Sequence, residues 1–153
     1  MVSEAARQRV ETERGAFAVL QRRYAGMHRP SAWQKRAVVE AWRRLGRNVT
    51  GAAFDMLRLR GDFDVWLATL NTTPSLVQCA TLLEVKSTKT YDTPRFAGMF
   101  FSLTEAEIQN AEALGRRFVF AFVNPLSERV HFASLSEIRR RGRMHLRWAV
   151  TLR

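Results

Sequence analysis

Two charged residues stand in an apolar stretch of the sequence, Leu83-Glu84-Val85-Lys86. In a strand the side chains alternate between two faces, so Glu84 and Lys86 share one face while Leu83 and Val85 enter the core. Charged groups in such a strand cost desolvation free energy unless they have partners. The pattern therefore predicts a partnered carboxylate and ammonium, in a chemical site or in a salt bridge at a strand edge.

A second carboxylate lies in the stretch Phe63–Leu70, which the sequence predicts to be the preceding strand. An antiparallel hairpin between the two strands places Asp64 beside Glu84. Two carboxylates in contact repel each other unless a cation lies between them, and Mg²⁺ suits a site of oxygen ligands completed by waters and substrate phosphate. We expect Asp64 and Glu84 to bind Mg²⁺, with Mn²⁺ as the alternative metal, and Lys86 to position the attacking water or stabilise the charge that develops on phosphate.

The register of this hairpin leaves other ligands open. Asp62 lies two residues before Asp64, so it shares the same face of the predicted strand and is the alternative metal ligand. Asp55 is a third choice, because it falls in a predicted helix where a surface charge is the simpler interpretation.

Periodicity and capping signals predict the elements that position these residues. Helices are expected over residues 3–27, 31–45 with Ser31 as N-cap, 50–59, 104–115 with a capping box at Thr104, and 134–142. Strands are expected over residues 63–70, 79–86, 95–103, 118–123, 130–133 and 144–152. This order predicts an α/β (α+β) fold with a mixed central sheet flanked by helices. In the 104–115 helix, the acidic residues Glu105, Glu107 and Glu112 are expected on the solvated side.

The motif Phe63-Asp64-Val65, followed twenty positions later by Glu84-Val85-Lys86, resembles the PD-(D/E)XK, or restriction-endonuclease-like, nuclease superfamily. The predicted order helix–strand–strand–strand–helix–strand is similar to the core of that family. The segment LLEVKSTK, followed by FFSLTEAEIQNAEALGRRFVFAFVNP, resembles the NO VEIN-type nuclease-like domain family in particular. The resemblance covers about residues 36–135.

This resemblance implies a restriction-endonuclease-like core that binds Mg²⁺ through Asp64, Glu84 and the carbonyl of Val85 and hydrolyses a phosphodiester bond. Some members add a glutamate from the first core helix, and Glu40 holds a comparable place in this sequence. Residues 1–30 then form an N-terminal helical extension, and residues 31–153 form the nuclease-like domain of one globular unit.

The charge of the chain also points to a polyanionic partner. Its net charge is +11, and the 25 basic residues comprise 22 arginines and 3 lysines. A GC-rich genome would also favour arginine, but uniform bias does not explain the distribution along the chain. Residues 1–60 and 129–153 carry net charges of +8 and +6, whereas residues 61–128 carry −3. Two basic flanks around an acidic middle are typical of a metal site that acts on nucleic acid.

Backbone phosphates are expected to contact residues that follow the motif and a basic run near the C-terminus. The candidates are Ser87, Thr88, Lys89, Arg139, Arg140, Arg141 and Arg143. We therefore expect a Mg²⁺-dependent DNA endonuclease. Double-strand cleavage by so small a subunit would require a homodimer.

Two other functions remain open from the sequence: a nuclease-like binding or assembly module without catalysis, and an enzyme of the same fold that cleaves RNA. The single cysteine excludes an internal disulfide framework and a cysteine-rich zinc site. No apolar run reaches the length of a membrane span, and the N-terminus lacks the apolar stretch of a secretory signal, so a cytoplasmic protein without membrane contact is expected.

Overall fold

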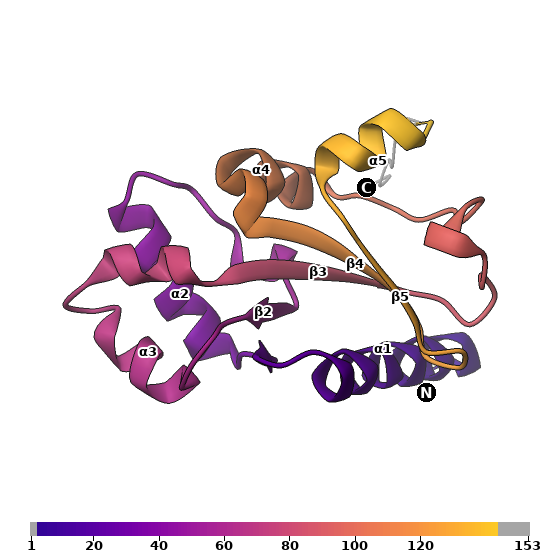
Figure 1. Ribbon diagram of the computed structural model, residues 1–153, viewed down its shortest axis with the longest axis horizontal. Coiled ribbons are helices and arrows are strands. Elements are labelled where there is room, and N and C mark those ends of the chain that lie inside the picture. The colour runs from indigo at the N-terminus through magenta and orange to yellow at the C-terminus, as the bar shows by residue number, and fades with distance from the viewer. Residues whose placement is uncertain (1–2, 144–153) are drawn as a thin grey trace, which may run out of the picture.

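The computed structural model describes residues 3–143 and shows a five-stranded sheet with helices on both faces (Figure 1). The strands lie in chain order, and all neighbouring pairs are antiparallel except β3 and β4, which are parallel. They are β1 (Met27–His28), β2 (Met56–Arg58), β3 (Thr81–Ser87), β4 (Phe118–Asn124) and β5 (Arg129–Ala133). The predicted α/β (α+β) class with a mixed central sheet is confirmed.

The described α-helices are α1 (Glu4–Arg23), α2 (Ala32–Arg44), α3 (Phe63–Thr69), α4 (Glu105–Leu114) and α5 (Leu135–Arg141). Short 3₁₀ turns are η1 (Gly51–Ala53), η2 (Pro74–Cys79), η3 (Pro94–Phe96) and η4 (Gly115–Arg117). The predicted N-caps are confirmed, since Ser31, Thr104 and Ser134 each accept the backbone N–H of the residue three positions later. Local capping chemistry thus sets where α2, α4 and α5 begin.

The helix predicted for residues 50–59 is wrong. Residues 51–53 form the turn η1, and β2 follows it directly. Leu57 and Leu59 are buried and alternate with the exposed Arg58 and Arg60. This period of two is a strand signal. A strand of three residues is too short for the pattern to stand out against a helical alternative.

The strand predicted for Phe63–Leu70 is also wrong, because residues 63–69 form α3. Asp62 is its N-cap and accepts the N–H of Val65 at 2.9 Å. The apolar residues of this segment recur at helical rather than alternating spacing: Phe63, Trp66, Leu67 and Leu70. The predicted hairpin between this segment and β3 is therefore not formed.

The strand predicted for residues 95–103 is absent from the described chain, which here contains η3 and irregular backbone. Arg95 and Phe96 both adopt positive φ values, 51° and 54°, which a strand cannot contain. The last predicted strand, residues 144–152, lies outside the described residues.

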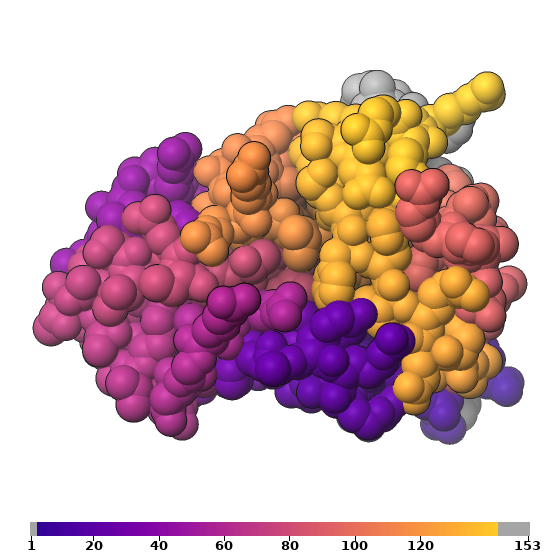
Figure 2. Space-filling model, viewed as in Figure 1, coloured from indigo at the N-terminus to yellow at the C-terminus, as the bar shows by residue number. Residues whose placement is uncertain are grey.

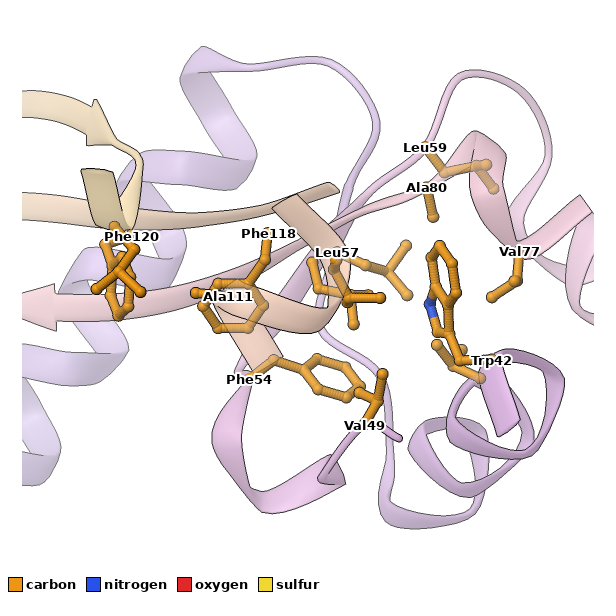
Figure 3. Close-up of a cluster of buried hydrophobic side chains, with 14 of the residues drawn as sticks. Trp42, Val49, Phe54, Leu57, Leu59, Val77, Ala80, Ala111, Phe118 and Phe120 are labelled. Atoms are coloured by element: carbon orange, nitrogen blue, oxygen red, sulfur yellow. The ribbon is translucent and has the colours of Figure 1, made fainter. Parts of the chain in front are cut away.

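One face of the sheet is covered by α2, α3, α4 and α5, and its buried side chains form the larger of two apolar clusters. Leu57, Leu82, Phe118 and Phe120 contribute from the strands. Figure 3 shows Trp42 of α2 turned into this cluster.

Within residues 3–143, α1 is the helix that covers the opposite face, and it lies across the sheet from α4 and α5 (Figure 1). Its apolar residues pack on Met56 of β2, on Leu83 and Val85 of β3, and on Ala121 and Val123 of β4. The last turn of α1 is also tied to the β4–β5 turn, because Arg22 and Arg23 both donate hydrogen bonds to Glu128. Figure 2 shows these two segments side by side on the surface. Residues 3–28 therefore pack into the same unit as the rest of the described chain.

Candidate active site

β3 carries the motif as expected. Leu83 and Val85 pack against α1, whereas Glu84 and Lys86 lie on the other face, the one covered by α4. The ammonium of Lys86 donates to Glu84 Oε1 at 3.1 Å and to Glu107 Oε1 of α4 at 2.9 Å. Glu84 is only 8% exposed and Glu107 only 5%. β3 and α4 together therefore hold the partly buried ammonium of Lys86 between two buried carboxyl groups.

Asp55 completes this group of charges. The β2–β3 ladder begins at Met56, which pairs with Leu83, and Asp55 immediately precedes it. The backbone N–H of Asp55 donates to the Leu83 carbonyl at 2.8 Å, and its Oδ2 accepts the N–H of Val85 at 2.9 Å. The carboxylate of Asp55 is close enough to Glu84 for its charge to raise the pKa of that group. Asp55 therefore takes the position beside Glu84 that the sequence prediction gave to Asp64.

The prediction that Glu107 lies on the solvated side of the 104–115 helix is wrong, because Glu107 is buried. It is the N3 residue of the capping box, where its Oε2 accepts the N–H of Thr104 at 3.0 Å. Its other oxygen accepts from Lys86. The capping box is visible in the sequence, but the burial of Glu107 depends on β3 lying against the start of α4.

The surroundings of Glu84 and Glu107 shift their pKa values in opposite directions. Burial, followed by the nearby charge of Asp55 and a hydrogen bond with Glu107, raises the pKa of Glu84 to about 8, although Lys86 acts in the opposite direction. Burial alone would raise the pKa of Glu107, but hydrogen bonds from Lys86, Glu84 and Thr104 outweigh it and lower that pKa. Near neutral pH, Glu84 is therefore the carboxyl group of this pair that more readily retains a proton.

The oxygen donors beside Val85 fit a Mg²⁺ ion. Glu84 Oε2 is buried and, as a carboxylate, has no hydrogen-bond partner among residues 3–143. The repulsion between Asp55 and Glu84 is what a cation would relieve. In a strand the N–H and C=O of one residue point to the same side, so the carbonyl of Val85 lies on the side of Asp55. Two carboxylates and a carbonyl leave places for the waters and phosphate that Mg²⁺ retains.

Glu107 does not extend this donor set, since Lys86 lies between it and Glu84. Over the described part of the chain, no three or more histidine, cysteine, aspartate or glutamate side chains are arranged to hold a metal. A Mg²⁺ ion held beside Val85 would therefore have the carboxylates of Asp55 and Glu84 and the Val85 carbonyl as its protein ligands, completed by non-protein ligands.

The other predicted metal ligands lie elsewhere. Asp64 is exposed in the first turn of α3, and Asp62 is exposed as the N-cap of that helix. Glu40 is exposed on α2 and forms a two-pronged ion pair with Arg43, at 2.6 and 2.8 Å. Within residues 3–143, neither α3 nor the side chain of Glu40 forms a hydrogen bond or an ion pair with Glu84 or Lys86.

The predicted phosphate contacts after the motif have partners of their own. Ser87 ends β3, and the side chain of Thr88 accepts the N–H groups of Thr90 and Tyr91. Lys89 lies 3.7 Å from Glu11 of α1. These residues form the turn that leaves the strand, directly after Lys86.

The predicted basic run belongs to α5 and the residues after it. Arg139 pairs with Glu112 of α4, and Arg141 bonds to Glu137, His131 and the carbonyl of Arg95. Arg140 and Arg143 are exposed and have no ion-pair partner within residues 3–143. These two arginines are the members of the run whose charge is least compensated.

No helix in the described chain is both long and apolar enough to cross a lipid bilayer. Comparisons of the chain with models of protein families, with curated proteins and with solved structures find no match.

Proposed function

We propose that this protein is a metal-dependent nuclease that hydrolyses phosphodiester bonds of DNA, with Asp55 and Glu84 as the metal ligands and Lys86 as the catalytic cation. The observation that carries the proposal is the meeting of Asp55, Glu84 and Lys86 at one end of the β2–β3 ladder. Asp55 here replaces both Asp64 and Asp62, because α3 holds those residues outside the sheet.

The order of the elements supports this proposal. The chain runs α1, β1, β2, β3, α4 and β4, with α2 and α3 inserted between strands. With α2 and α3 left out, this order is similar to the helix–strand–strand–strand–helix–strand core of the superfamily that the motif resembles, but it takes its first helix and strand from residues 4–28, which the sequence resemblance left outside that core. The net charge of +11 further favours a polyanionic substrate.

The chemistry follows from the groups present. Mg²⁺ bound by Asp55, Glu84 and the Val85 carbonyl would neutralise phosphate charge and lower the pKa of a coordinated water. Lys86 donates one ammonium hydrogen to Glu84 and one to Glu107, which leaves the third for a water or a phosphoryl oxygen. Glu107 holds this ammonium in place. Hydrolysis then forms a bond from the water oxygen to phosphorus and breaks the bond to the leaving sugar oxygen.

A second candidate function is a nuclease-like module that binds nucleic acid without cleaving it. The ion triad Glu84–Lys86–Glu107 favours this alternative, because Lys86 already compensates both carboxylates. This module would bind DNA in a salt-sensitive manner without needing a metal. A homodimer remains a prediction for either function.

Cleavage of supercoiled plasmid and branched DNA in Mg²⁺, Mn²⁺ or EDTA tests the proposal. We expect metal-dependent nicking that Asp55→Asn and Lys86→Met reduce by about a thousandfold or more, which is typical of removing a principal electrostatic contact. Asp64→Asn, a matched change on α3, should cleave like the wild type. Salt-sensitive binding without cleavage in any metal would favour the non-catalytic module. Preferential cleavage of an RNA competitor would identify RNA, not DNA, as the substrate.

A further inference from the structure

Asn110 is a buried polar residue that the proposed chemistry does not use. It lies on α4, one turn after Glu107, and its side chain is fully buried. Its amide donates to the carbonyls of Thr50 and Ala53 at 2.9 and 3.2 Å and accepts the N–H of Thr50 at 2.8 Å. A single side chain therefore satisfies three backbone groups of the segment that leads into β2.

This segment determines where Asp55 lies. The β2–β3 pairing begins at Met56, and Asp55 is joined to it only through its own N–H and carboxylate. Residues 50–53 precede that ladder and have no strand partner, so their position depends on contacts with helices. Asn110 supplies these contacts from α4, and Lys35 of α2 adds a hydrogen bond to the Phe54 carbonyl at 2.5 Å.

The spacing on α4 connects the two halves of the site. Residues three apart on a helix project from the same side, so Glu107 and Asn110 face the sheet together. Glu107 holds Lys86 of β3, while Asn110 holds the turn that presents Asp55. One face of α4 thus contacts Lys86 directly and, through Asn110, the segment that precedes Asp55.

We propose that Asn110 is a positioning residue that holds the carboxylate of Asp55 opposite Glu84. This inference rests on the proposed function for its effect on metal affinity, but the positioning itself can be measured without a metal. Asparagine suits this role because its amide offers both donors and an acceptor without charge. Buried groups that hold a metal ligand in place typically change metal affinity 10- to 100-fold when removed.

Asn124 provides a matched control. It is also an almost fully buried asparagine, 2% exposed, and it also makes three hydrogen bonds to backbone groups, namely those of Tyr91, Leu126 and Ser127. These groups belong to the loop after β3 and to the β4–β5 turn. Asn110→Ala and Asn124→Ala therefore remove equivalent interactions at different distances along the chain from Asp55.

The first measurement is the amide hydrogen exchange of Val85 in EDTA, since this N–H donates to Asp55. If Asn110 positions Asp55, exchange should become about tenfold faster in Asn110→Ala than in Asn124→Ala at equal global stability, set by adjusting temperature. Equal protection of Val85 in the two variants would overturn the proposal.

The second measurement is Mn²⁺ binding by titration calorimetry. Asn110→Ala should weaken the affinity about tenfold or more, with Asn124→Ala within about threefold of the wild type. Equal losses of Mn²⁺ affinity in the two variants would overturn the proposal, because they would show that Asn110 contributes only to the stability of the fold. If the wild type itself binds no Mn²⁺ while the Val85 exchange still differs, the metal-dependent function is wrong and the positioning role stands.

Discussion

The two faces of the central sheet use alternate residues of the same strand in opposite ways. On the α1 face, Leu83 and Val85 pack against Phe17, Leu20 and other apolar side chains. On the other face, the intervening Glu84 is buried and pairs with the partly buried Lys86 next to an apolar cluster. The difference arises from the covering helix, since α4 brings Glu107 to the second face.

This comparison shows why the charges are confined to one face. Buried charges are tolerated only where partners offset the cost of desolvation. α1 presents Ala16, Phe17, Val19 and Leu20 to the sheet and offers no such partner. Among residues 3–143, two carboxylates and an ammonium are brought together on the α4 face, where β3, α4 and the residue before β2 contribute charged side chains.

The largest expected effect comes from removing the cation of the charged face. Lys86→Met leaves Glu84, Glu107 and Asp55 without a compensating charge, so the free energy of unfolding should fall by about 3–5 kcal/mol. Urea unfolding at pH 9 in EDTA, where Glu84 is ionised, measures this loss. Lys86→Arg should retain most of the stability. A loss below about 1 kcal/mol would mean that the two faces tolerate charge equally.

A change on the apolar face should affect stability without affecting the site. Leu83 is 1% exposed, so Leu83→Ala should lower the free energy of unfolding by about 2–5 kcal/mol through the lost contacts and the resulting cavity. Mn²⁺ affinity, measured below the unfolding transition, should equal that of the wild type. A parallel decrease in Mn²⁺ affinity would show that the two faces are coupled through β3.

The pH dependence of stability distinguishes the faces further. Because the pKa of Glu84 is raised to about 8 in the folded protein, the native state binds more protons than the unfolded chain between about pH 4.5 and 8. Stability in EDTA should therefore fall as pH rises through this window, by up to about 1.4 kcal/mol per pH unit.

Glu84→Gln should flatten this profile, and urea unfolding from pH 5 to 9 measures it. The lowered pKa of Glu107 has the opposite sign, but its contribution is lost only below about pH 4.5, outside the measured range. The apolar-face variant Leu83→Ala should keep the wild-type slope. An unchanged slope in Glu84→Gln would contradict the assignment of the retained proton.

The smallest expected effect concerns Asp64, which lies on neither face. Its carboxylate stabilises only the first turn of α3, so Asp64→Asn should cost about 0.3–1 kcal/mol at low salt. Thermal unfolding at low and high salt measures this term, which salt should diminish. A loss of several kcal/mol would place Asp64 in a buried site instead.

Local patterns in the sequence predicted a substantial part of this structure. The N-cap residues located the starts of α2, α4 and α5, and runs of apolar residues located β3 and β4. The segment between residues 50 and 70 was predicted incorrectly because β2 and α3 are short. Over three to seven residues, strand and helix periods differ by too few positions to separate clearly.

The sequence alone determined that Glu84 and Lys86 share one face of a strand, because alternation along β3 is a local property. Only the tertiary structure decided which aspartate lies beside them. Asp55, Asp62 and Asp64 are similar in the sequence, but pairing between β2 and β3 selects Asp55. The burial of Glu107 likewise depends on how α4 packs against β3. Strand register and helix packing arise from contacts between distant segments, which no local pattern specifies.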